Sequence, residues 1–95
     1  MTGPEAGPAA HTSGLTLLVR EECELCEQMA ASLAALARRT PLPRIATADV
    51  DSRVEWQRRY GLKVPVLLLD GTPVCRTRLD ESELLSALRR RGDRL

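Results

Sequence analysis

Apolar positions along this chain fall into short continuous runs and into one run with helical spacing. Residues 15–20 and 64–69 are nearly continuous apolar runs, which are typical of strands buried on both faces of a sheet. From about Cys23 to Arg39 the period becomes that of a helix, which Pro41 and Pro43 bring to an end. The inner stripe of that helix is predicted from four residues: Leu25, Met29, Leu33 and Leu36.

The second half of the chain repeats both patterns. Residues 44–50 are predicted as a strand, and Ser52-x-x-Glu55 has the form of a capping box for a helix that Gly61 ends. Asp70-Gly71 predicts a two-residue hairpin turn between residues 64–69 and a returning strand over 72–77. That strand contains a proline, which favours an edge position. A last helix is predicted over 80–91, capped by its first residue and followed by a glycine.

The predicted order of elements is strand, helix, strand, helix, strand, strand, helix. A helix joins the first two strands, so they are expected to be parallel, and the hairpin makes the sheet mixed. The expected fold is therefore α/β, with a four-stranded mixed sheet flanked by helices. Residues 1–13 are rich in glycine, proline and alanine and are predicted to be a disordered tail, which leaves residues 14–95 for one domain.

Charge and composition limit the kinds of binding partner that are expected. The formal net charge of +1 is spread along the chain, so neither a nucleic-acid surface nor a membrane surface is expected. The apolar runs are too short to span a bilayer, and the first residues do not have the pattern of a signal peptide. These features predict a cytoplasmic protein, where a close cysteine pair is more often catalytic or metal-binding than structural.

Cys23-Glu24-Leu25-Cys26 stands where the first strand gives way to the first helix. Two intervening residues on a helical turn bring the sulfurs close enough to bond. The first sulfur lies at the helix N-terminus, where the dipole and free amides favour a thiolate, and the second lies one turn inside. The motif therefore predicts dithiol–disulfide chemistry with Cys23 as nucleophile and Cys26 as resolving thiol.

Together with a second motif, Tyr60-Gly61-Leu62-Lys63-Val64-Pro65-Val66, the cysteine pair resembles the glutaredoxin-like branch of the thioredoxin superfamily over about residues 14–91. The resemblance implies a thioredoxin fold of order βαβαββα. It also implies that Pro65 is a cis-proline facing the cysteine pair, and that Val64 offers its backbone to a substrate strand.

The chain differs from glutaredoxins in two segments that are relevant to glutathione binding. Glu24-Leu25 stands between the cysteines in place of a proline-aromatic pair, and the glycine pair after the hairpin is replaced by Thr77-Arg78-Leu79-Asp80. Whether glutathione is bound is left open.

Two arginines are further candidates for the site. Arg20, three residues before Cys23, is a candidate for supporting the thiolate or binding substrate, the alternative being a solvated charge at a strand end. The hairpin turn predicts that Arg76 pairs with Pro65, which makes it a candidate for a substrate carboxylate.

Other functions remain open. Cys75 and His11 nominally complete a four-ligand zinc set with the cysteine pair, although no second Cys-x-x-Cys is present. Cys75 is more simply a small buried hydrophobic residue, and Trp56 and Tyr60 are interpreted as packing residues.

The predicted activity is reduction of disulfides in a protein or a small thiol substrate, by a monomer with no bound cofactor and no metal. A separate reductant, with glutathione or another thiol as candidates, restores the dithiol. The alternatives are a non-catalytic redox-sensing or adaptor module and a metal or iron–sulfur binding module.

Overall fold

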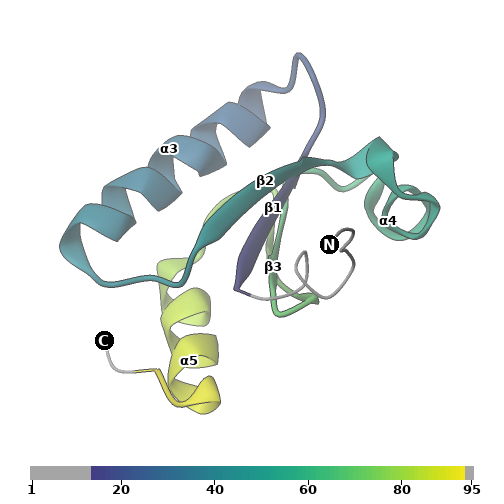
Figure 1. Ribbon diagram of the computed structural model, residues 1–95. Coiled ribbons are helices and arrows are strands. Elements are labelled where there is room, and N and C mark those ends of the chain that lie inside the picture. Colours follow the sequence, from purple (N-terminus) through teal and green to yellow (C-terminus); the bar gives the residue numbers. More distant parts are fainter. Residues whose placement is uncertain (1–13, 94–95) are drawn as a thin grey trace, which may run out of the picture.

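The computed structural model describes residues 14–93, so the predicted tail, with His11, lies outside the described residues. Its elements follow one another in the predicted order (Figure 1). They are β1 (Leu15–Val19), α3 (Glu24–Arg39), β2 (Ile45–Asp49), the 3-10 turn η1 (Val50–Ser52), α4 (Val54–Tyr60), β3 (Val66–Leu69), β4 (Thr72–Arg76) and α5 (Glu81–Arg91). The fold is the βαβαββα arrangement of the thioredoxin fold.

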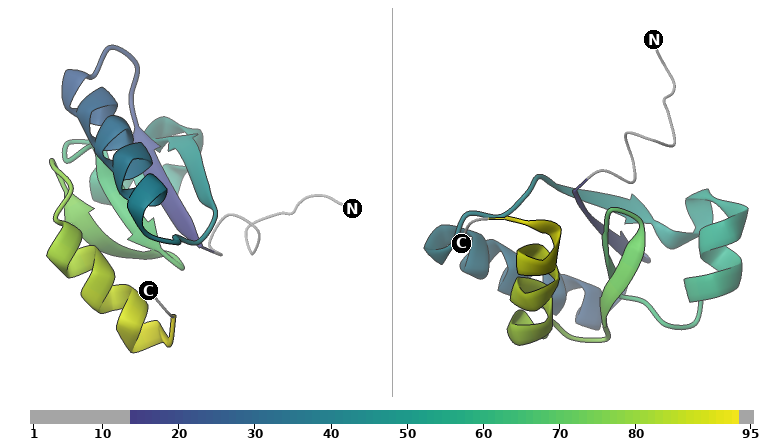
Figure 2. Two further views of the ribbon diagram at one scale, coloured as in Figure 1. Left: turned by 90° about the vertical axis from the view of Figure 1, so that its left-hand side faces the viewer. Right: turned by 90° about the horizontal axis from the view of Figure 1, so that it is seen from below.

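The sheet has four strands in the order β2-β1-β3-β4. β1 pairs with β2 in parallel, while β1 with β3 and β3 with β4 pair antiparallel, as the mixed-sheet prediction required. Helices α3 and α5 cover one face of the sheet and α4 covers the other (Figures 1 and 2). β4 is an outer strand, as its proline predicted.

The two central strands are buried on both faces. Their side chains alternate between the two faces of the sheet and pack into two separate hydrophobic cores. The core under α3 and α5 takes Leu15, Leu17, Leu67 and Leu69 from β1 and β3. The core under α4 takes Leu18, Val66 and Leu68 from the same strands and adds Val50, Trp56 and Tyr60. Trp56 and Tyr60 are thus packing residues, as interpreted from the sequence.

The inner stripe of α3 differs from the prediction by one residue. Leu25 is 43% exposed, whereas Cys26 is 3% exposed and belongs to the buried set with Met29, Leu33 and Leu36. Each residue of a helix is rotated by about 100° from the one before it, so Leu25 and Cys26 point in different directions. The face of α3 that packs on the sheet begins with Cys26. The prediction for Leu25 was wrong, whereas the burial of Cys26 agrees with its predicted sheltered position one turn inside the helix.

The capping box predicted at Ser52 and Glu55 is absent. The residue at the N-cap of α4 is Arg53, which makes no side-chain cap bond. Ser52 belongs instead to η1, where its hydroxyl donates to the carbonyl of Asp49. A short 3-10 turn therefore precedes the helix and uses the hydroxyl that the motif assigned to the cap.

The caps predicted for α5 are present. The Asp80 carboxylate accepts from the amide of Glu83 at 3.1 Å, and Gly92 ends the helix with φ of 101°. A positive φ at this position is easiest for glycine.

The hairpin at Asp70-Gly71 is present, with positive φ at both residues and Leu69 paired with Thr72. Beyond it the register shifts, because Leu68 pairs with Pro73 while Leu67 pairs with Cys75, which leaves Val74 as an extra residue. Arg76 therefore pairs with Val66, and the predicted pairing of Arg76 with Pro65 was wrong. A bulge of this kind lets proline, which has no N–H, sit in an edge strand without breaking the rest of the ladder.

None of the helices within residues 14–93 is long and apolar enough to cross a membrane.

Candidate redox site

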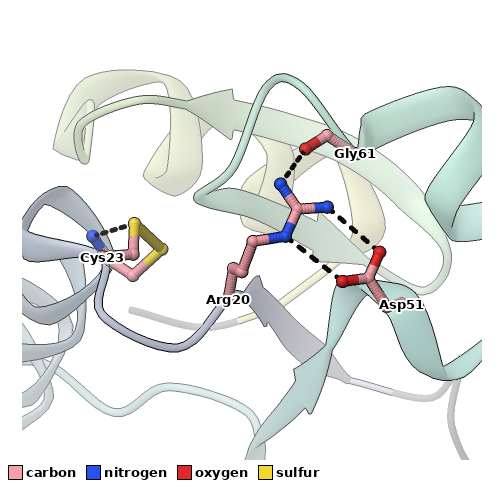
Figure 3. The surroundings of a disulfide bond; sticks show 5 residues. Arg20, Cys23, Asp51 and Gly61 are labelled. Carbon is pink, nitrogen blue, oxygen red and sulfur yellow. Dashed lines mark hydrogen bonds and ion pairs between the residues drawn. A yellow bond between two sulfur atoms is a disulfide. The ribbon is translucent and has the colours of Figure 1, made fainter.

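Cys23 and Cys26 form a disulfide at the start of α3 (Figure 3). Cys23 is the N-cap residue, with extended backbone, and its sulfur accepts a hydrogen bond of 3.2 Å from the amide of Cys26. The two Cα atoms are 5.2 Å apart, which is within the usual range for a disulfide. The connection from β1 turns sharply at Glu22, whose φ is 55°. One sulfur thus occupies the position at which a helix N-terminus best stabilises an anion.

The two cysteines differ in access. Cys23 is half-buried, and Cys26, one turn further along α3, is 3% exposed. A disulfide of an incoming molecule can reach Cys23 more readily than Cys26, because Cys26 is the more deeply buried of the two. This difference matches the predicted division into nucleophile and resolving thiol, whose roles in turnover stay predictions.

The Val64–Pro65 peptide bond is cis, as the resemblance implied. Pro65 is buried and its carbonyl accepts from the amide of Thr77 at 2.9 Å, while Val64 is half-buried. β3 begins at the next residue, so the cis bond lies at the end of the sheet at which β1 leads into Cys23. Binding of a substrate strand by Val64 stays a prediction.

The guanidinium of Arg20 turns away from the disulfide toward two other segments (Figure 3). It donates to both carboxylate oxygens of Asp51, at 3.2 and 3.0 Å, and to the carbonyl of Gly61 at 2.6 Å. This pairing lowers the pKa of the Asp51 carboxyl and raises the pKa of the Arg20 guanidinium. No local pattern in the sequence predicts this arrangement, because its three residues are widely separated along the chain.

Arg76 is exposed at the end of β4, and its side chain lines a hollow of about 380 Å³ with Pro73, Val74 and Cys75. It has no ion pair with any residue in the described part of the chain. Its predicted role in binding a substrate carboxylate stays a prediction.

A pocket of about 260 Å³ lies directly against the disulfide, on the side of β2. Its walls include Val19, Ala30 and Thr47, and both cysteines reach it. Carboxylates surround the same end of α3. They are Glu21, Glu22, Glu24 and Glu27, all exposed and, within residues 14–93, without hydrogen bonds or ion pairs from their side chains. Because Asp51 pairs with Arg20, these acids dominate the charge beside Cys23.

Cys75 is a free thiol in the core under α3 and α5 and is 6% exposed. Its sulfur donates a weak bond of 3.6 Å to the carbonyl of Asp80, and burial raises the pKa of the thiol. The sequence-based view of Cys75 as a small buried hydrophobic residue is confirmed. No three histidine, cysteine or acidic side chains within residues 14–93 come together as a metal site, and His11 lies outside that range.

Comparison with family models places the chain in a known domain family. Residues 14–89 match the model of the glutaredoxin-like domain family, DUF836. The chain belongs to this family. The resemblance inferred from the cysteine pair and from the valine–proline motif is therefore confirmed, and the match spans all but the last two residues of α5.

Several solved structures are similar to this chain in fold. Protein Ne2328 from Nitrosomonas europaea is 26% identical, with a TM-score of 0.68 over 90% of this chain and 98% of its own. Protein XcR50 from X. campestris is 31% identical, with a TM-score of 0.56 over 80% and 96% of the two chains. Fasciola hepatica thioredoxin is 25% identical, with a TM-score of 0.50 over 85% of each. No curated protein matches the chain.

Proposed function

We propose that this glutaredoxin-like protein is a thiol–disulfide oxidoreductase that reduces disulfides of protein substrates. The observation that carries the proposal is the disulfide between Cys23 at the N-cap of α3 and the buried Cys26. A cis-proline at the same end of the sheet supports it. A structural staple has no need of one sulfur held half-exposed at a helix N-terminus, whereas an exchange reaction requires it.

The reaction begins from the reduced dithiol. The Cys23 thiolate attacks one sulfur of the substrate disulfide, and the other substrate sulfur leaves as a thiolate that takes up a proton. Cys26 then loses its proton and attacks the sulfur of Cys23, which releases the second substrate thiol. The substrate has gained two electrons and two protons, and the protein is left as the Cys23–Cys26 disulfide. A separate dithiol or thiol reductant returns the two electrons.

The charges around Cys23 support protein disulfides over glutathione as substrates. Four free carboxylates flank the attacking sulfur, and oxidised glutathione carries net negative charge at neutral pH. Like charges at the mouth of a site slow association, while a cationic surface around a substrate disulfide speeds it. The proposal includes that the protein works as a monomer in the cytoplasm, where the thiol pool is reducing.

A reductase assay of the wild-type protein and of two variants, each with one cysteine replaced, tests the proposal. The wild-type protein, kept reduced by an excess of dithiothreitol, is expected to accelerate insulin precipitation above the dithiothreitol background. Cys23→Ser is expected to remove this acceleration. Cys26→Ser, reduced beforehand and then incubated with insulin in the absence of dithiothreitol, is expected to stall as a mixed disulfide that is visible by mass spectrometry and is released when dithiothreitol is added.

The matched control is Cys75→Ala, which is expected to keep the wild-type rate. A wild-type protein that gives no acceleration, with a Cys26→Ser variant that traps nothing, would favour the non-catalytic adaptor.

A further inference from the structure

Arg20 connects the two segments that lead into the redox site. The chain passes from Arg20 to Cys23 in three residues and from Gly61 to Pro65 in four. Three or four residues span at most roughly 10–14 Å even when extended. Fixing Arg20 against Gly61 therefore limits where the cis-proline can lie relative to the attacking sulfur.

The contact is built as a closed ring. Arg20 donates to Asp51 and to the Gly61 carbonyl, and Asp51 also accepts from the side chain of Gln57 at 3.2 Å. The carbonyl of Gln57 in turn accepts the amide of Gly61 at 3.0 Å. The ring thus joins the end of β1, the η1 turn and the C-terminus of α4, where a cation also complements the helix dipole.

Position 61 has little room for any other residue. A Cβ atom there would lie 2.5 Å from the carbonyl oxygen of Gln57 and 3.5 Å from Nη2 of Arg20. The first distance is shorter than real side chains tolerate. The backbone at Gly61 therefore approaches α4 closely, and the guanidinium of Arg20 contacts the same residue.

Burial already anchors the body of α4, because Trp56 and Tyr60 are each 7% exposed in the core beneath it. The ring is therefore not needed to hold the helix on the sheet. What it adds is a fixed position for the carbonyl of Gly61, from which the chain runs through the exposed Leu62 and Lys63 to Val64. This is the segment whose backbone is proposed to receive the substrate.

We propose that Arg20 is a positioning residue of the redox site, which holds the segment 61–65 in place beside Cys23 through Asp51 and the Gly61 carbonyl. It acts through geometry rather than by placing its charge on the thiolate. The role rests on the proposed function, since it concerns how the same site receives a protein disulfide. Each of the three guanidinium nitrogens donates a hydrogen bond within this ring.

Steady-state kinetics of insulin reduction separate geometry from charge. Arg20→Met and Asp51→Asn are each expected to raise KM about 10-fold, with kcat changed less than about 2-fold, because interactions within one network are lost together. The double variant is expected to be no worse than either single variant. Arg20→Lys keeps the charge but lacks the planar fork, so it is expected to restore KM only in part.

Arg91→Met is the matched control, because Arg91 makes a comparable fork with Asp70 and Asp93 at the opposite end of the sheet. It is expected to leave KM unchanged. Full recovery by Arg20→Lys, together with a raised Cys23 pKa in Arg20→Met and a normal KM in Asp51→Asn, would overturn the proposal in favour of a charge effect.

Hydrogen exchange decides the inference without reference to activity. The amides of Gly61 and Lys63 are bonded to the carbonyls of Gln57 and Tyr60. They are expected to exchange about 10-fold faster in Arg20→Met and Asp51→Asn than in Arg91→Met, while amides of β1 and β3 stay protected. Equal protection in the three variants would refute the positioning role. If the wild-type protein reduces no disulfide, the proposed function fails, and this comparison still stands as the test of the inference.

Discussion

Asp70 and Arg91 form an ion pair of 2.9 Å at the end of the sheet opposite the disulfide. The Asp70 carboxylate also accepts from the amide of Gly14 at 2.8 Å, so it joins the start of β1, the hairpin turn and the end of α5. These bonds lower the pKa of Asp70 below its ordinary value, the contact with Arg91 being the largest cause. The stability that the carboxylate contributes is therefore present above the pKa of the unfolded chain and is lost as pH falls.

Asp70→Asn is expected to lower the free energy of unfolding at pH 7 by about 1 kcal/mol, since the pair is partly exposed. The difference from wild type is expected to shrink as pH falls below about 4, where the unfolded aspartate takes up a proton. Urea unfolding across this range measures it. Glu55→Gln, which removes only an exposed pair of 3.7 Å, is the control and is expected to change little. A gap that stays constant down to pH 2 would contradict the assignment.

Limiting iodoacetamide applied to the reduced protein is expected to label Cys23 first. Cys23 is only half-buried at the N-cap of α3, whereas Cys26 is buried, and the thiolate is the reactive form. Peptide mapping by mass spectrometry measures the order. Preferential labelling of Cys26 would reverse the assignment of nucleophile and resolving thiol.

The pKa of Cys23 in the reduced protein is expected to lie only modestly below that of free cysteine. The helix N-terminus favours the thiolate, but the neighbouring carboxylates oppose it, each by about 1 kcal/mol or less at the surface. A thiolate that is not strongly stabilised makes the dithiol a reductant rather than an oxidant. Thiolate absorbance against pH, paired with a titration against glutathione, measures both. A strongly acidic Cys23 with an oxidising potential would contradict the reductase function.

Cys75 is expected to react with iodoacetamide at pH 8 about 10-fold or more slowly than Cys23. Burial raises the pKa of its thiol, so the folded protein must open before this residue is alkylated. Reaction in guanidinium chloride is the control, in which the three cysteines are expected to label alike. Rapid labelling of Cys75 under native conditions would show that the core beside α5 is open.

Reversing charge next to the cysteine pair is expected to change substrate preference. The variant Glu21→Lys/Glu24→Lys is expected to raise kcat/KM for oxidised glutathione several-fold and to lower it for a disulfide within a lysine-rich peptide. Added salt is expected to weaken both changes, since exposed charges are screened. Glu55→Lys is the control, because this exposed acid lies on α4 rather than beside the cysteine pair. An unchanged substrate preference in low salt would show that the charge of the carboxylates beside the cysteine pair does not select substrates.

Local patterns in the sequence determined the order of elements, the mixed sheet, the edge position of the proline-containing strand and the place of the cysteine pair. Each depends on neighbours within a few residues: alternation or helical spacing, the turn at Asp70-Gly71, and the switch from strand to helix before Cys23. The cis bond at Pro65 came from the family motif. All of these features follow from short-range patterns and from the family resemblance.

Only the tertiary structure decided what depends on distant segments. It placed Leu25 at the surface rather than in the core, because the rotation of α3 relative to the sheet selects the buried face. It paired Arg76 with Val66 instead of Pro65, because the bulge at Val74 shifts the register of the hairpin by one residue. It also joined Arg20 to Asp51 and Gly61, which are 31 and 41 residues away. No local pattern encodes such contacts, since they form only when packing brings the ends of β1, η1 and α4 together.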